Sequence, residues 1–287
     1  MTRAAALSID LESYWHAELL RKRIDRRSAD DRVLPATLPL LDLLAKRGVR
    51  ATFFVVGEII ESHPALVQRI VQEGHEIACH SFSHRPLWDL SEAQFDAELA
   101  RFSEIVGRHL PGVKPRGFRA PTFSLSPTTA WALDVLAQHG YRYDSSIFPL
   151  RTPLYGVPNV PPAPYRPAPN LVDSDPTSPI VEWPMTAWRA GPLTIPVCGG
   201  FYLRVMPMPL ILHGLRQAQK RGPIVIYLHP WELDTDTPRL PLSRGDTFIT
   251  YHNIGAVMRR RLETLLDNFD FTPLWDVLRA GNYDISG

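Results

Sequence analysis

The sequence predicts an α/β protein built from parallel strand–helix–strand units. Short apolar runs alternate with helical patterns through the first half of the chain, at about 30 residues per unit. These helical patterns end at Gly48, Gly74 and Gly140, and glycine is favoured just after a helix C-terminus. The segment 223–228 is apolar throughout, which is typical of a strand buried on both faces. A wound sheet and a barrel both fit this alternation.

Each predicted element has its own signal along the chain. Strands are predicted where apolar residues run together, at 4–9, 49–56, 75–79, 117–118, 141–147, 179–183 and 223–228. Helices are predicted where apolar residues recur at three- and four-residue spacing, near 38–48, 59–74, 91–106, 126–140, 208–219 and 254–266. Ser91 and Ser126 are the expected N-caps of two helices, the second with Pro127 at its first position.

The composition limits the function classes. The 287 residues include 31 Lys and Arg against 30 Asp and Glu, and this balance gives no reason to expect nucleic acid as a partner. Two cysteines, Cys79 and Cys198, cannot build a disulfide framework. No window has the apolar length of a transmembrane helix or a signal peptide. We expect a cytoplasmic protein, and nothing in the sequence indicates its oligomeric state.

Proline is concentrated in the middle of the chain. Of the 28 prolines, ten lie between Pro149 and Pro179. Composition alone allows a linker between two domains at this place. However, the candidate site residues lie on both sides of the stretch and have to meet. We therefore expect a long, stiffened loop of one domain, beside the site.

Polar residues collect where the predicted strands end, which is the edge that carries active sites in parallel barrels. They come from separated segments: Asp10, Glu12, His80, Arg119, Glu182 and His229. The strongest local signal is H-S-F-S-H at 80–84, because two imidazoles four residues apart can hold a metal ion. Either Asp10 or Glu12 is the candidate third ligand, since residues i and i+2 of a strand point the same way.

Together these motifs resemble the polysaccharide deacetylase family, carbohydrate esterases with NodB homology (carbohydrate esterase family 4). The family's motifs occur in order as D-x-E at 10–12, H-S-F-S-H at 80–84, F-R-A-P at 118–121, an acid–Trp element at 182–183 and L-H-P-W-E at 228–232. The resemblance spans about residues 5–232. The segment 198–204 and the region after Glu232 resemble a subfamily associated with exopolysaccharide biosynthesis loci.

The resemblance implies a fold and an activity. The fold is a distorted (β/α) barrel with fewer than eight complete units and a long Pro-rich loop in the middle. A single polysaccharide deacetylase domain would span residues 1–287, with a subfamily extension from about 233 to 287. The activity is metal-dependent hydrolysis of an N-acetyl group on an amino sugar, in a glycan or a glycan precursor.

The resemblance also assigns roles at the metal. Glu12, His80 and His84 would hold one divalent ion, with Zn²⁺ expected. Asp10 would act as the base toward water, and Arg119 would keep it ionised. Most family members have adjacent aspartates in the first motif, whereas Leu11 intervenes here. Related subgroups with D-x-E use the later acid as the ligand, which is why Glu12 receives that role.

The remaining roles concern the leaving group and the substrate. His229 would protonate the leaving amine, and Glu182 nearby would favour its cationic form. The backbone N–H of Thr122 would stabilise the oxyanion, although the family usually has Tyr at this position. Residues around these groups would wall the site or contact the substrate: Pro121, Thr122, Trp183 and Trp231.

Two alternative functions stay open. Some relatives resemble allantoinases and cyclic imidases, which cleave C–N bonds in small ring compounds. A catalytically inactive glycan-binding module is the other alternative. Retention of the polar set from Asp10 to His229 argues against the inactive module.

Overall fold

The computed structural model describes residues 4–25, 30–281 and 283. Its main sheet is parallel and consists of β1 (Ala5–Leu11), β2 (Thr52–Val55), β3 (Glu76–Cys79), β4 (Gly117–Phe118), β5 (Tyr143–Asp144), β6 (Val181–Glu182), β9 (Ile224–Leu228) and β10 (Phe271–Thr272). Hydrogen bonds join the strands in the order β9–β1–β2–β3–β4–β5–β6, and β10 pairs with the first residues of β1. The predicted α/β fold is confirmed as a half-barrel of parallel strands.

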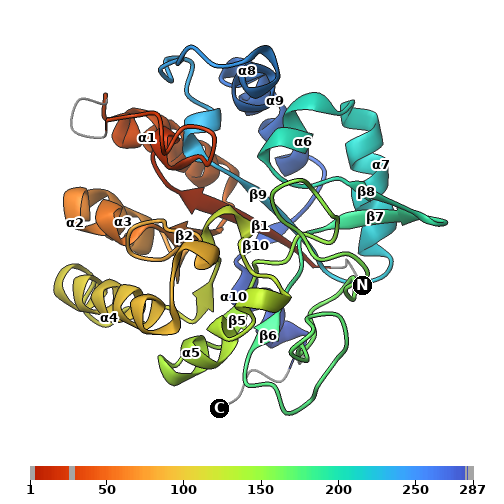
Figure 1. Cartoon of the computed structure of the whole chain (residues 1–287). Coiled ribbons are helices and arrows are strands. Elements are labelled where there is room, and N and C mark those ends of the chain that lie inside the picture. The colour runs from red at the N-terminus through yellow and green to blue at the C-terminus, as the bar shows by residue number, and fades with distance from the viewer. Residues whose placement is uncertain (1–3, 26–29, 282, 284–287) are drawn as a thin grey trace.

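Helices pack around this sheet, as Figure 1 shows. They are α1 (Val33–Arg47), α2 (Gly57–Ser62), α3 (Pro64–Gln72), α4 (Glu92–His109), α5 (Ala132–Gln138), α6 (Gly200–Val205), α7 (Met208–Gln219), α8 (Arg244–Tyr251), α9 (Ala256–Leu266) and α10 (Leu274–Ala280). No helix in the described part of the chain is long and apolar enough to cross a membrane.

Local signals explain where several elements begin and end. Ser91 caps α4 as predicted, because its hydroxyl accepts a hydrogen bond from the backbone N–H of Gln94. Gly48 ends α1 with a φ of 64°, a conformation that glycine adopts without steric cost. The helix predicted at 59–74 is two helices, α2 and α3. They meet at His63-Pro64 because proline disfavours a helical conformation at the residue before it.

Other predicted boundaries need correction. β1 continues to Leu11, so Asp10 lies within the strand rather than after it. The strand predicted at 141–147 is only the two residues of β5. Ser126-Pro127 begins a 3₁₀ turn (Pro127–Thr129) that precedes α5, rather than the α-helix itself. A hairpin of β7 (Ala187–Ala190) and β8 (Leu193–Pro196) was not predicted at all.

The half-barrel is open between β6 and β9. The hydrogen-bonded strand order ends at these two strands, and the chain between them forms the hairpin, α6 and α7. One side chain bridges the opening, because Thr186 Oγ1 accepts a hydrogen bond from Val225 N of β9 at 2.8 Å. The chain after β6 therefore fills the space that further barrel strands would occupy.

The proline-rich stretch packs onto this half-barrel. Val160 and Leu171 of this stretch are fully buried in the main core. Tyr165 of the same stretch forms an antiparallel bridge with Glu182 of β6. Leu154 and Tyr155 line the cavity at the carboxyl ends of the strands, which agrees with the expected loop beside the site. The single-domain arrangement with an extension from about 233 stays a prediction.

Candidate active site

The carboxyl ends of β1, β3, β4 and β9 open into one cavity. Each of these ends carries polar residues of the predicted set, as expected for a parallel barrel. The cavity is lined by Asp10, Glu12, Ala17, Glu18, Leu19, His80, His84, Ala120, Thr122, Phe123, Leu154, Tyr155, Phe201, Arg204, Tyr227, His229, Trp231, Glu232, Ile249 and Thr250. Residues from both ends of the sequence thus meet at one place.

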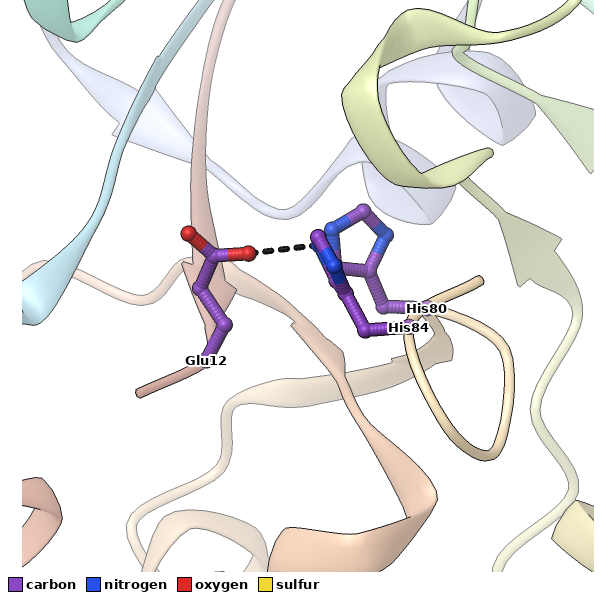
Figure 2. A group of neighbouring side chains, drawn as sticks. All are labelled: Glu12, His80 and His84. Carbon is purple, nitrogen blue, oxygen red and sulfur yellow. Dashed lines mark ion pairs between the residues drawn. The ribbon is translucent and has the colours of Figure 1, made fainter. Parts of the chain in front are cut away.

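Three of these residues form a compact cluster suited to a metal ion. Glu12, His80 and His84 are all buried and offer ligand atoms within 4.8 Å of one another. In Figure 2 the carboxylate of Glu12 points toward the two imidazoles, and its Oε2 lies 2.6 Å from Nε2 of His84. Two imidazoles and one carboxylate are a common ligand set for catalytic zinc. The structure therefore brings together the three predicted ligands.

The environment of the ligands suits them to bind a cation. Burial lowers the pKa of His80 well below its ordinary value, so its imidazole is neutral. Its Nδ1 lies 2.7 Å from the backbone oxygen of Arg119 and donates the hydrogen bond, which leaves the Nε2 lone pair free as a ligand. Burial would raise the pKa of Glu12, but the imidazoles of His84 and His229 lower it below its ordinary value. Glu12 therefore carries negative charge.

The loop that holds both imidazoles has an unusual backbone. Ser81 and His84 have φ values of 63° and 57°, in the left-handed region that non-glycine residues seldom adopt. Glu98 of α4 stabilises this loop. Its carboxylate accepts hydrogen bonds at 2.7–3.0 Å from the hydroxyls of Ser81 and Ser83 and from the backbone N–H groups of Phe82 and Ser83.

Asp10 lies beside the ligands and is held by Arg119. Arg119 is fully buried, and its Nη1 donates to Asp10 Oδ1 at 2.5 Å and to Ser8 Oγ at 2.9 Å. Its Nε and Nη2 donate to the backbone oxygen and the hydroxyl of Ser145. Burial raises the pKa of Asp10, and the charge of Arg119 opposes this shift without cancelling it. Arg119 thus fixes one carboxylate oxygen of Asp10 as predicted, while Oδ2 lies toward His229.

His229 reaches into the same cavity from the end of β9. Its Nε2 lies 3.6 Å from Glu12 Oε1 and 3.9 Å from Asp10 Oδ2. Burial would lower its pKa, but the carboxylates of Glu12, Glu232 and Asp10 raise the pKa to about 9. These carboxylates therefore favour the imidazolium form of His229, which can donate a proton.

The predicted substrate-contact residues have different surroundings. Trp231 lines the cavity, stacks on His229, and donates from Nε1 to Glu12 Oε1 at 3.2 Å. Thr122 also lines the cavity and has a φ of 57°, so the chain turns sharply there. Pro121 begins this turn and is buried beneath it. Trp231 and Thr122 are therefore placed to meet a substrate.

Two predicted placements are wrong. Trp183 does not wall the cavity, because its side chain is fully buried in the core. Glu182 does not contact His229. Its Oε1 accepts from Ile147 N at 3.0 Å, and its carboxyl contacts that of Asp144, which raises the pKa of Glu182 beyond what burial alone does. Glu232 is the acid beside His229, at 3.0 Å from its Nδ1.

Sequence reasoning missed Glu232, Arg204 and Glu98 as site residues. Glu232 stands three residues after His229, and this i, i+3 spacing within L-H-P-W-E is a signal that could have found it. Arg204 closes the segment 198–204 that the resemblance singled out, but nothing in its neighbourhood indicates a distant partner. Glu98 has the pattern of an ordinary helix surface residue.

Two family models match the chain. Residues 29–143 match Polysaccharide deacetylase, and residues 145–279 match a domain of unknown function, DUF3473. His80, His84 and Arg119 lie in the first match, whereas His229 and Glu232 lie in the second. The cavity therefore combines residues from both matched regions.

Curated relatives match about a third of the chain. The chitooligosaccharide deacetylase of Bradyrhizobium sp. (strain ANU 289) is 37% identical over 109 residues, which are 38% of this chain and 47% of that protein. The peptidoglycan-N-acetylglucosamine deacetylase of Bacillus cereus is 39% identical over 88 residues, 31% of this chain and 32% of that protein. The matched segments therefore span less than half the length of these relatives.

Solved structures share the fold over nearly the whole chain. A protein from Mycobacterium smegmatis described as a polysaccharide deacetylase aligns with a TM-score of 0.59 at 20% identity, over 96% of this chain and 89% of that one. A peptidoglycan deacetylase from Bacillus subtilis aligns with a TM-score of 0.51 at 14% identity, over 98% and 93%. From the family model we conclude that residues 29–143 belong to a polysaccharide deacetylase domain, and the solved structures show that the fold is shared over nearly the whole chain.

Proposed function

We propose that this chain is a metal-dependent deacetylase that hydrolyses an N-acetyl group on an amino sugar of a glycan or glycan precursor. The observation that carries the proposal is the cluster of Glu12, His80 and His84 beside the ion pair of Asp10 and Arg119. This arrangement places three candidate metal ligands beside a carboxylate, that of Asp10, which is not itself one of the ligands. The proposed substrate class follows that of the deacetylase relatives, which are named for N-acetylated sugars.

The ligand set fits one divalent ion, for which we propose Zn²⁺. His80 presents a neutral Nε2, and Glu12 presents a carboxylate that Trp231 orients from the other side. When bound by these residues, the ion supplies Lewis acidity toward the amide oxygen and acidifies water. Asp10 then accepts the proton of the water whose oxygen adds to the acetyl carbon. Arg119 keeps the Asp10 carboxylate in one orientation throughout.

The second half of the reaction uses His229, whose Nε2 lies 3.9 Å from Asp10 Oδ2. His229 donates its Nε2 proton to the sugar nitrogen as the C–N bond breaks, so the products are acetate and a free amine. The backbone N–H of Thr122 donates to the oxygen that bears the developing negative charge. The Trp231 ring stacks on His229 and restricts its rotation. A fixed acid, His229, and a fixed base, Asp10, perform the two proton transfers.

Acetate release from a substrate panel tests this proposal. The panel spans N-acetylglucosamine, a nucleotide-linked form, a lipid-linked form, chitooligosaccharides and allantoin. We expect acetate from at least one N-acetylated sugar, about one divalent ion per chain, and loss of both in His84→Ala. His109→Ala, at the end of α4, is the matched control and should keep the ion and the activity.

Three results would overturn the proposal. The first is full activity after metal removal, and the second is opening of the allantoin ring without release of acetate from any sugar. The third is glycan binding without acetate release at every metal loading. The cytoplasmic location and the association with exopolysaccharide biosynthesis stay predictions from the sequence.

A further inference from the structure

His229 is held in one orientation by Glu232. The Oε2 atom of Glu232 accepts hydrogen bonds from both the backbone N–H and the Nδ1–H of His229, each at 3.0 Å. Glu232 ends the short 3₁₀ turn (Pro230–Glu232) after β9, and His229 is the N-cap residue of this turn. Because Nδ1 is occupied, the Nε2 of His229 faces the cavity and the carboxylate of Asp10. Glu232 therefore determines which imidazole nitrogen meets the substrate.

Glu232 is itself held by a buried arginine. Arg204 of α6 is 2% exposed, and its Nε donates to Glu232 Oε1 at 2.8 Å. Its Nη1 and Nη2 donate to the backbone oxygens of His252 and Ile249, at 2.6 and 2.8 Å. Arg204 thus spans two elements, the turn that carries His229 and the end of α8. Ile249 and its neighbour Thr250 line the cavity, so the same guanidinium also fixes a cavity wall.

The backbone of α6 packs closely against the ion pair of Arg204 and Glu232. A Cβ at Gly200, in the first turn of α6, would lie 2.1 Å from both carboxylate oxygens of Glu232. Only glycine lets the helix approach the carboxylate this closely. A buried ion pair is costly unless its hydrogen-bonding capacity is used, and here all three bonding nitrogens of Arg204 have acceptors.

We propose that Arg204, acting through Glu232, is a positioning residue that orients His229 toward the leaving amine. Through its bonds to the end of α8, Arg204 also links this orientation to the cavity wall that α8 forms. The proposal rests on the proposed function, because it assigns His229 a proton-transfer role. Both residues lie in the region 145–279 that matches the domain of unknown function. That region would therefore supply the second half of a deacetylase site, namely the acid, its support and one wall.

Substitution of the two residues separates their effects. Glu232→Gln replaces the carboxylate that orients His229 but leaves the two bonds from Arg204 to the end of α8, so kcat should fall about 10- to 100-fold with little change in KM. Arg204→Lys cannot reach three acceptors, so it should lower kcat similarly and also raise KM through the α8 wall. In a His229→Ala background, Glu232→Gln should cause no further loss of kcat, because its effect passes through His229.

Arg261→Lys is the matched control. Arg261 also supports α6, since its Nη1 donates to the backbone oxygens of Leu203 and Met206, but it contacts neither Glu232 nor α8. This variant should lose thermal stability and keep kcat. Equal losses of kcat in Arg261→Lys and Arg204→Lys would overturn the proposal. A further loss from Glu232→Gln in the His229→Ala background would also overturn it, because the role would then be purely structural.

A spectroscopic measurement decides the inference without turnover. An Nδ1–H bonded to a carboxylate gives a downfield proton resonance, which His229→Ala removes and thereby assigns. This resonance should move upfield in Glu232→Gln and broaden in Arg204→Lys, and an unchanged resonance in both variants would overturn the positioning role. If the wild-type protein releases no acetate from any sugar, the proposed function fails, and the resonance still tests how Arg204 and Glu232 hold His229.

Discussion

Asp10 and Glu12 are two carboxylates, two residues apart, with different surroundings. Asp10 receives the guanidinium of Arg119, whereas Glu12 receives the imidazole of His84 and the indole N–H of Trp231. Burial raises the pKa of Asp10, while the neighbouring imidazoles lower that of Glu12. This difference in environment supports a division of labour in which Glu12 binds the ion and Asp10 takes up a proton.

The Asp10→Asn variant tests this division. The amide keeps the shape of the side chain but is a far weaker base, so kcat should fall by about 100-fold or more while the metal content stays near that of the wild type. Metal content and kcat are measured on the same preparation. Loss of the ion from Asp10→Asn would mean that the two acids have exchanged roles.

Glu182 and Asp144 form a second pair of buried acids, away from the cavity. Ser146 donates to one oxygen of Asp144, and the two carboxyls contact each other. Burial first, and the neighbouring acid next, raise the pKa of Glu182 well above its ordinary 4.5. The folded chain therefore keeps a proton on this pair that the unfolded chain releases above pH 4.5. The free energy of unfolding should fall as the pH rises toward the raised pKa.

Glu182→Gln removes this dependence. At pH 8 the variant should be more stable than the wild type by about 1 kcal/mol, and near pH 4 the difference should vanish. Urea unfolding of both proteins between pH 4 and pH 9 measures this difference in the free energy of unfolding. Asp173→Asn is the control, because Asp173 is exposed in the proline-rich stretch. A wild-type stability that does not change with pH over this range would contradict the protonated pair.

At the scale of elements, the loop from His80 to His84 depends on α4. Glu98 accepts four hydrogen bonds from this loop, in which Ser81 and His84 have the left-handed backbone conformation. Strained backbone persists where the surroundings over-determine it. The metal ligands are thus positioned by a helix that contributes no ligand.

Glu98→Gln should therefore weaken metal binding. The amide nitrogen would face N–H and O–H donors instead of accepting from them, so we expect about a 10-fold loss of metal affinity. Competition with a chelator measures this affinity. Glu104→Gln on the same helix, where the carboxylate meets only Arg108, should leave it unchanged. Equal affinities for the wild type and Glu98→Gln would show that the loop holds its shape unaided.

Across the whole molecule, β1 joins the two regions that the family models separate. It pairs with β2 from the first region and with β9 and β10 from the second. All seven residues of β1 are buried, so neither neighbour can be removed without exposing apolar surface to water. This arrangement predicts that the two regions fold together.

Full-length protein should unfold in one cooperative transition, measured by both circular dichroism and tryptophan fluorescence. A fragment of residues 1–143, which ends where the first match ends, should show no cooperative transition because β1 lacks β9. Two separable transitions in the full chain, or a fragment that unfolds cooperatively, would contradict this prediction.

Much of the fold and of the site was predictable because its signals are local. Continuous apolar runs marked β4 and β9 to within a residue, and periodic spacing marked α7 at its bounds. The candidate metal ligands were predictable because His80 and His84 stand four residues apart, and because the family resemblance assigned Glu12 as the third ligand. Boundaries failed where short strands depend on pairing, as at β5, whose two residues are extended only beside β4 and β6.

The sequence by itself determined the parallel strand–helix alternation and, through the resemblance to the deacetylase family, the half-barrel, the candidate ligands Glu12, His80 and His84 and the pairing of Arg119 with Asp10. Only the tertiary structure decided the partners of His229. The acid predicted from β6, Glu182, contacts Asp144 instead, while Glu232 and the distant Arg204 hold the imidazole. The physical reason is the opening between β6 and β9, which the chain from β7 to α7 fills. Where that irregular segment places α6 depends on packing between distant residues, which no periodicity in the sequence records.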